Sequence, residues 1–187
     1  LARIADVSDR YATGNLHITT RQDIQLHFVK LEDTPQLWEE LAQDKITIRE
    51  ACGNTVRNVT GSHLAGVHPD APFDITSYAQ ATFEYLVRNP ICQDMGRKFK
   101  ISFSAAEDDD YYSYINDIGL IPRIRIEDGQ EVHGFKVLIA GGLGAQPNHA
   151  DLVHEFLPVD QLIPFTEGLI RAFDRYGERT KRNKARM

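Results

Sequence analysis

The chain has 187 residues, 42% of them hydrophobic and 26% charged, with a formal net charge of −6 at pH 7. This size and composition are ordinary for a protein that folds in water, and they allow one large domain or a domain and a half. The acidic balance argues against nonspecific binding to nucleic acid, which depends on accumulated Lys and Arg. No apolar run approaches the roughly 18 residues that a membrane span needs, so we expect no membrane partner.

The cysteines and the N-terminal pattern bear on the cellular compartment. Cys52 and Cys92 are far apart, and neither has a cysteine or histidine partner at metal-binding spacing. We therefore predict neither a disulfide framework nor a zinc site. Residues 1–14 have the pattern of an amphipathic helix rather than of an export segment, so we expect a cytoplasmic protein.

The first part of the chain predicts a helix, strand material and a second helix. Their expected positions are residues 4–11, 17–29 and 34–43. In the stretch HITTRQDIQLHFV, alternation places Ile24, Leu26 and Phe28 on a core side, with Gln25 and His27 opposite. We expect the histidines of this stretch to be structural.

The helix over residues 34–43 is indicated by a capping Thr34 followed by proline at the first helical position. Leu37, Trp38 and Leu41 are expected to share its buried face. The next residues, 51–74, are rich in Gly, Asn and Pro, and they indicate a short strand and a functional loop.

A third helix is predicted over residues 75–90, with Asp74 as its cap and Pro90 at its end. The side chains expected to face inward are Tyr78, Ala81, Tyr85 and Leu86.

The middle of the chain is rich in strands. RKFKISFSA alternates strictly, with Phe99, Ile101 and Phe103 on the core side and Lys98, Lys100 and Ser102 opposite. Residues 120–142 predict two strands joined at Asp128-Gly129, a strong hairpin signal. Residues 158–179 predict a helical stretch interrupted by Pro164. The whole pattern predicts an α+β fold with an antiparallel or mixed sheet.

Common catalytic and nucleotide-binding motifs are poorly matched in this sequence. The acidic run AEDDDYYSY, residues 106–114, is expected to be a solvated loop. GGLGAQP is a poor dinucleotide fingerprint because Pro147 stands where the third glycine is required. Cys52 can be imagined as a nucleophile, but a lone cysteine is more often a small buried hydrophobic residue.

Basic residues on strands or at strand ends are the remaining candidates for a site. Arg21 follows HITT, Arg57 lies in CGNTVRNV, and Lys98 and Lys100 share one strand face. Each of them alone is typical of a surface charge. Together with the glycine loop, they resemble the nitrite and sulfite reductase family, whose members carry sirohaem and an iron-sulfur cluster.

Four motifs carry this resemblance. LHITTRQDIQLHFV is similar to the family's TTRQ strand, ACGNTVRNVTG to its arginine loop, GRKFKISFSA to its lysine strand and GFKVLIAGGLGAQP to its glycine loop. The motifs follow the family's order over nearly the whole chain, which is unlikely to arise by accident.

The resemblance implies a two-part fold. Residues 1–46 would be part of a ferredoxin-like half-domain, and residues 47–187 would form an α+β sirohaem-binding domain with a mixed or antiparallel sheet. The family holds its 4Fe-4S cluster with two close pairs of cysteines, and this sequence has neither pair. We therefore expect an excised piece whose cluster ligands lie outside this chain and which is inactive alone.

The resemblance also assigns site residues. Arg21, Arg57, Lys98 and Lys100 match the residues that surround the substrate anion on the open face of the haem. Sirohaem carries carboxylates, and negative charges removed from water need cationic partners. The residues expected to contact sirohaem are Thr20, Gln22, Asn58, Gly141, Gly142, Gly144, Arg179 and Arg186. No residue is assigned to a metal.

The implied activity is reduction of sulfite to sulfide or of nitrite to ammonia. The implied partners are an electron donor, either ferredoxin or a reductase subunit, and the missing second half of the same chain. A nucleic-acid module is a less favoured alternative, because Phe99 and Phe103 lie opposite Lys98 and Lys100 and cannot share a binding platform with them. A noncatalytic copy of the same fold is the other alternative, and such a copy would be expected to lose the basic residues.

Overall fold

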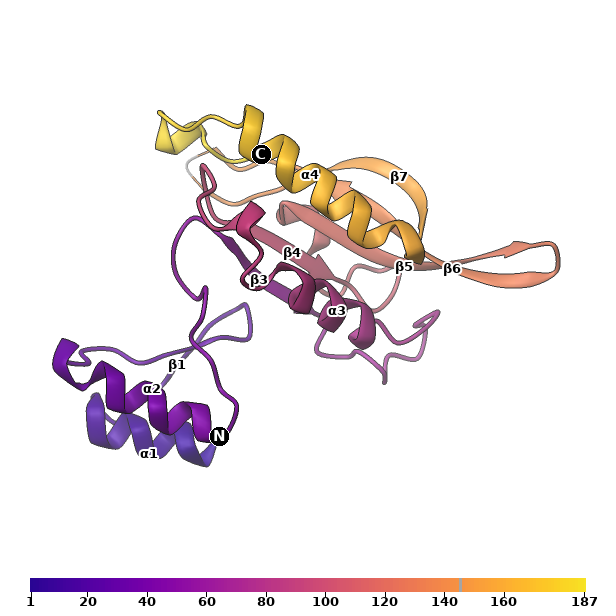
Figure 1. The fold of residues 1–187 in the computed structure, drawn as a ribbon. Helices are drawn as coiled ribbons and strands as arrows, with labels where there is room; N and C mark the ends of the chain where they lie inside the picture. The colour runs from indigo at the N-terminus through magenta and orange to yellow at the C-terminus, as the bar shows by residue number, and fades with distance from the viewer. Residues whose placement is uncertain (145) are drawn as a thin grey trace. The chain divides into compact units, whose positions relative to one another are not determined.

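The computed structural model of the protein describes residues 1–144 and 146–187. The chain divides into two compact units, Leu1–Arg49 and Glu50–Met187 (Figure 1). Helices and a mixed sheet together confirm the predicted α+β class. Within the described ranges, no helix has both the length and the apolar character that crossing a membrane requires.

The first unit is built around two packed helices. Its elements are α1 (Ala2–Tyr11), β1 (His17–Ile18), β2 (Ile24–Gln25), the 3-10 helix η1 (Leu31–Asp33) and α2 (Thr34–Gln43). Val7 of α1 and Leu37 and Leu41 of α2 form its buried core. Trp38 is 48% exposed, contrary to expectation. Residues four apart share a helix face, whereas Trp38 is rotated away from Leu37 by about 100°.

The prediction of strand material throughout residues 17–29 is wrong. The chain reverses in the middle of this stretch, where the Thr19 N–H donates to the Asp23 carbonyl at 2.9 Å. The Thr19 side chain also accepts a bond from the Asp23 N–H, and Gln22 is left-handed with φ 61°. The predicted core side fails too, because Phe28 is 88% exposed. A threonine side chain that bonds the backbone N–H groups of following residues has favoured a turn over a strand.

The second unit contains a five-stranded mixed sheet in the described part of the chain. Its elements are β3 (Val56–Gly61), α3 (Thr76–Leu86), η2 (Pro90–Cys92), β4 (Phe99–Phe103), η3 (Ser113–Ile115), β5 (Ile118–Glu127), β6 (Gln130–Ile139), β7 (Asp151–Pro158), η4 (Val159–Gln161), α4 (Leu162–Tyr176) and η5 (Arg182–Lys184). The strand order is β3-β4-β5-β6-β7. Strands β3, β4 and β5 run parallel, whereas β6 is antiparallel to both of its neighbours.

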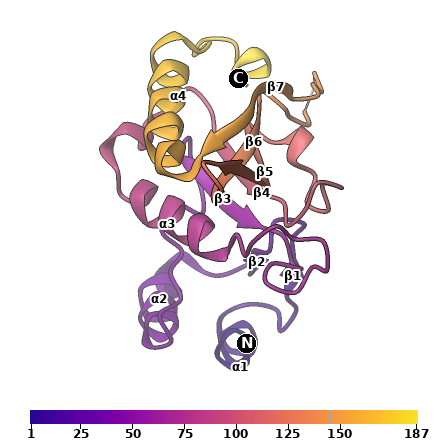
Figure 2. The ribbon, with the colours of Figure 1, turned by 90° about the vertical axis from the view of Figure 1, so that its right-hand side faces the viewer.

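Helices α3 and α4 cover the same face of this sheet (Figure 2). Phe99, Ile101 and Phe103 of β4 are fully buried in the core beneath them, as predicted. Leu86 of α3 and Ile170 of α4 belong to the same core cluster. Because strand side chains alternate, the residues between the buried aromatics face the other side of the sheet.

The Asp-Gly hairpin is confirmed. Glu127 pairs with Gln130, so the turn consists of Asp128 and Gly129. Both turn residues have positive φ, 50° and 79°. This is the conformation of a type I′ turn, whose twist matches that of the flanking strands.

The predicted inward face of the third helix is partly wrong. Ala81 and Tyr85 are exposed, and the buried stripe instead runs through Ile75, Thr82 and Leu86. A spacing of seven and then four residues keeps these three positions on one helical face. The N-cap residue of α3 is Ile75 rather than the predicted Asp74, which lies one residue earlier and accepts a bond from the Thr76 N–H at 2.9 Å through its Oδ1.

Two further differences concern the C-terminal part. Pro164 does not interrupt α4, because it is the third residue of the helix, where the backbone N–H has no partner within the helix. Strand β7, which pairs with β6 at the edge of the sheet, was not predicted.

Gly141 shows why one glycine of the GGLG loop is needed for folding. A Cβ atom at this position would lie 2.5 Å from the Tyr114 carbonyl oxygen and 2.8 Å from that of Asn116. Both neighbours are backbone, which cannot move aside cheaply.

Gly141→Ala is therefore expected to lower the free energy of unfolding by about 1–3 kcal/mol through overpacking. Gly168→Ala in α4 is the matched control, because nothing lies within 4 Å of the added methyl group. We expect the control to stabilise the chain by about 0.5–1 kcal/mol, since alanine is the better helix former. Urea unfolding of both variants measures the difference, and equal effects would contradict the packing role of Gly141.

Candidate functional site

A β-bulge lies between β3 and β4. The register pairs Val56 with Phe99 and Val59 with Ile101. Arg57 and Asn58 therefore stand together opposite the single residue Lys100. Asn58 is left-handed, with φ 58°. Bulges of this kind bend a strand and redirect its side chains, and they are frequent beside functional sites.

Three of the predicted substrate residues lie on one face of the sheet. Arg57 follows the core residue Val56, and Lys100 follows the core residue Phe99, so both point away from α3 and α4. Lys98 precedes Phe99 and falls on the same side by the same alternation. We call the side of the sheet that carries Arg57, Lys98, Lys100 and Ser102 the basic face.

The donors of the basic face are unusually buried. Lys100 is only 4% exposed. The Nε of Arg57 and the Oγ of Ser102 are buried without a hydrogen-bond partner among the described residues. Buried polar groups are normally paired, so orphaned donors beside a buried lysine fit an anionic ligand such as a carboxylate or an oxyanion.

A buried carboxylate that the sequence analysis missed lies at the start of β5. Asp117 is 1% exposed, and its Oδ2 accepts the Lys100 N–H at 2.8 Å. Its Oδ1 accepts bonds from Arg186, at 2.7 Å from Nη2 and 3.1 Å from Nε. Burial raises the pKa of Asp117, whereas the charges of Arg186 and Lys100 oppose that shift. Its only sequence signal is an acidic residue directly before a buried strand.

The glycine loop packs against protein groups. A Cβ at Gly142 would lie 3.0 Å from Nη2 of Arg186, so the missing side chain makes room for that guanidinium. Among the described residues, nothing lies within 4 Å of a Cβ added at Gly144. Contact of Gly141, Gly142 and Gly144 with sirohaem remains a prediction.

Arg179 is engaged at the end of α4. Its guanidinium forms an ion pair with the Asp174 side chain, and its Nε donates to the Asp174 carbonyl oxygen of α4 at 3.3 Å. A basic side chain that bonds carbonyl groups at a helix end stabilises that end. A role for Arg179 toward sirohaem also remains a prediction.

Arg21 lies in the first unit, within the turn that divides the TTRQ motif. The Gln22 N–H donates to the Thr19 carbonyl oxygen at 3.2 Å, which leaves Thr20 and Arg21 at the two central turn positions. The Arg21 N–H donates to Thr19 Oγ1 at 3.3 Å. The three predicted ligands of this motif therefore lie on one tight turn.

The acidic run is not simply a solvated loop. Asp110 accepts bonds from the Ser62 hydroxyl, from the Ser104 hydroxyl at 2.6 Å and from the Ala105 N–H at 2.9 Å. Burial acts to raise the pKa of Asp110, but these hydrogen bonds hold it below its usual value. Asp110 thus ties together the chain segments that follow β3 and β4.

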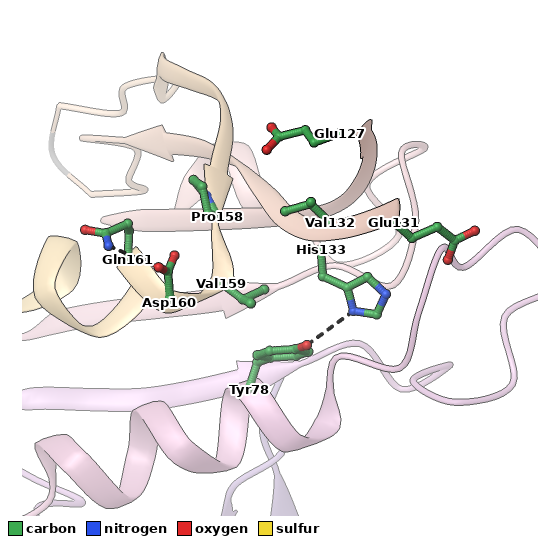
Figure 3. Close-up of a pocket in the computed structure, with 9 residues that line it drawn as sticks. All are labelled: Tyr78, Glu127, Glu131, Val132, His133, Pro158, Val159, Asp160 and Gln161. Carbon is green, nitrogen blue, oxygen red and sulfur yellow. Dashed lines mark hydrogen bonds between the residues drawn. The ribbon is translucent and has the colours of Figure 1, made fainter. Parts of the chain in front are cut away.

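An open groove lies elsewhere, on the helix-covered side of the sheet (Figure 3). In it, the Tyr78 hydroxyl and His133 Nδ1 are 3.3 Å apart. Its rim carries the carboxylates of Glu127, Glu131 and Asp160. None of the predicted site residues lines this groove, and its acidic rim does not suit an anionic substrate.

The aromatic residues of β4 cannot serve a nucleic-acid interface. Phe99 and Phe103 are both 0% exposed. A stacking platform needs aromatic faces that bases can reach. The structure therefore removes the feature on which the nucleic-acid alternative depended.

The two cysteines differ in environment. Cys52 is exposed and Cys92 is buried, and both are free thiols. The Cys92 thiol donates to the Leu86 carbonyl oxygen at 3.2 Å, and burial raises its pKa to about 11. Among the residues that the structure describes, no group of three or more His, Cys, Asp or Glu could hold a metal ion.

We expect iodoacetamide at pH 8 to alkylate Cys52 much faster than Cys92 in the folded chain, because the thiolate is the reacting form. Mass spectrometry of tryptic peptides measures both rates. The control is the same reaction in denaturant, where the two rates should approach each other. Equal labelling of the folded chain would contradict the burial of Cys92.

Comparison with known proteins gives two family matches. The family described as nitrite and sulphite reductase 4Fe-4S domain matches residues 52–187, and the nitrite/sulfite reductase ferredoxin-like half domain matches residues 1–44. The assimilatory ferredoxin-dependent nitrite reductase of Haloferax mediterranei is 33% identical over 100% of this chain and 34% of its own length. A sulfite reductase [ferredoxin] of Mycobacterium tuberculosis is 29% identical over 100% of this chain and 33% of its own.

Solved structures agree with these relatives. The structure of the Mycobacterium tuberculosis NirA protein superposes with a TM-score of 0.88 at 29% identity, covering 98% of this chain and 33% of that one. Dissimilatory sulfite reductase I has a TM-score of 0.67 at 14% identity, covering 98% of this chain and 60% of that one, which is a likeness of fold alone. The chain spans about a third of the length of the curated relatives it matches.

Proposed function

The chain belongs to the nitrite and sulphite reductase family, and from this premise we propose that it supplies the anion-binding face of a sirohaem-dependent reductase. The reaction of the whole enzyme is reduction of sulfite to sulfide or of nitrite to ammonia. The observation that carries the proposal is the bulge that sets Arg57 opposite Lys100 on the basic face.

In this proposal, Arg57, Lys98 and Lys100 bind the substrate anion together with Arg21. The orphaned Nε of Arg57 supports it, because a buried donor is costly without a partner, and Lys100 on the same face is only 4% exposed. The residues that would hold sirohaem are Thr20, Gln22, Asn58, Gly141, Gly142, Gly144, Arg179 and Arg186. When bound, sirohaem supplies the iron that takes the substrate, with electrons from a 4Fe-4S cluster whose ligands we place outside these 187 residues.

The chain's own residues would orient the anion and deliver protons. Arg57 offers a planar fork of N–H donors that stays charged, which suits a fixed grip on an oxyanion. Each substrate oxygen that leaves as water consumes two protons. Lys98 and Lys100 can donate them from their ammonium groups and regain them from solvent. In a site shielded from water these interactions are stronger than they are in bulk water.

We also propose the partners of the whole protein. Relatives are named as ferredoxin-dependent enzymes, so ferredoxin is our first choice of electron donor. A reductase subunit is the second choice. The remaining two thirds of the length of such relatives would contain the second half of the fold.

In the full-length enzyme, Lys100→Ala is expected to lower turnover per bound sirohaem roughly 100-fold or more, because proton donors and oxyanion donors each contribute on this order. Lys98→Ala should act in the same direction. Sirohaem content, measured from the visible absorption spectrum, should fall much less than turnover. Lys30→Ala, which removes an exposed lysine of the first unit, is the matched control.

The opposite pattern would refute these roles. If sirohaem loading collapsed while turnover per sirohaem stayed normal, the lysines would hold the cofactor rather than serve the substrate.

A further inference from the structure

Asp117 has the contacts of a residue that organises the basic face. Its carboxylate accepts the backbone N–H of Lys100 and two bonds from the guanidinium of Arg186. Hydrogen bonds in which donor or acceptor is charged are about twice as strong as neutral ones. A carboxylate that is 1% exposed cannot exchange these partners for water.

The bond to Lys100 lies at an end of the sheet ladder. Pairing of β4 with β5 begins at Ile101 and Ile118 and continues toward Phe103. At the preceding position, the Asp117 side chain accepts the N–H of Lys100. The backbone from which the Lys100 side chain extends is therefore fixed by a side chain as well as by strand pairing.

Arg186 is held from several directions. It bonds Asp117, its Nη2 lies 3.4 Å from the Gly141 carbonyl oxygen, and Gly142 leaves room beside it. The Arg186 side chain keeps 21% of its surface exposed. It can therefore meet a ligand while it stays bonded to Asp117.

Charge balance gives Asp117 a second role. Lys100 and Arg186 are like charges, and their repulsion grows when water is excluded. A carboxylate near both cations offsets that repulsion. The positive charges of Lys100 and Arg186 both act to lower the pKa of Asp117. Removal of one member of a buried charged set leaves the others poorly compensated.

We propose that Asp117 is a positioning residue that fixes Lys100 and Arg186 for binding of the substrate anion. The inference rests on the proposed function of Lys100. Asp117 itself need not touch the substrate, since it acts through the two cations that it bonds.

The test is Asp117→Asn in the full-length enzyme. Asparagine can still accept the Lys100 N–H but carries no charge. We expect turnover per sirohaem to fall about 10- to 100-fold, the usual cost of changing a residue that orients a site residue, because Arg186 loses its charged acceptor. We also expect weaker binding of nitrite or sulfite, measured by optical titration of the sirohaem. Asp44→Asn, which breaks an exposed pair with Arg3, is the matched control.

The binding titration separates positioning from a simple charge effect. Loss of a negative charge near an anion site would by itself tighten anion binding, whereas loss of positioning weakens it. In an Arg186→Ala background, Asp117→Asn should add little, because asparagine keeps the acceptor for the Lys100 N–H and its effect passes mainly through Arg186. Unchanged turnover together with unchanged or tighter anion binding would overturn the proposal.

A second variant covers the case in which Asp117→Asn does not retain sirohaem. Gly142→Ala displaces only the flexible end of Arg186 and leaves Asp117 in place. Reduced turnover per sirohaem supports positioning, and normal turnover overturns it. If Lys100→Ala itself has no effect, the proposed function fails rather than this inference alone.

Discussion

The alternation of side chains along β4 is the constraint on which the site depends. Phe99, Ile101 and Phe103 are drawn into the core beneath α3 and α4, and their burial is complete. Burying a phenylalanine or isoleucine contributes about 1.5–3 kcal/mol, so the strand cannot turn over without losing several such contributions. Lys100 is thereby held on the opposite side. The adjacent bulge gives β3 one extra residue, so that Arg57 and Asn58 both lie opposite Lys100.

A buried cation needs a nearby negative charge or hydrogen-bond acceptor, and this requirement links distant parts of the second unit. Asp117 bonds the backbone of β4 and the side chain of Arg186, 69 residues further along the chain. The glycine loop makes room for the same guanidinium. Among the described residues, the Nε of Arg57 and the Oγ of Ser102 on the basic face are buried without a hydrogen-bond partner. An anionic ligand on that face would satisfy both donors.

Local patterns predicted much of the fold, and side-chain hydrogen bonds account for several failures. The alternation of β4 and the Asp-Gly hairpin could be predicted because each depends on neighbouring residues alone. The turn at Thr19 could not be predicted, since alternation alone does not show that a threonine side chain bonds the backbone of the residues that follow it. Asp117 was missed for another reason. Its importance depends on which strand lies beside it and on where Arg186 returns, and neither is local information.

The most direct test is a crystal structure of the full-length enzyme with sirohaem and bound nitrite or sulfite. We expect Nζ of Lys100 and the guanidinium of Arg57 each to lie within about 3.2 Å of an anion oxygen, which is hydrogen-bond distance. We also expect the sirohaem to lie on the side of the sheet away from α3 and α4. An anion bound by other residues, with Arg57 and Lys100 in contact only with protein groups, would show that the basic face does not bind the substrate.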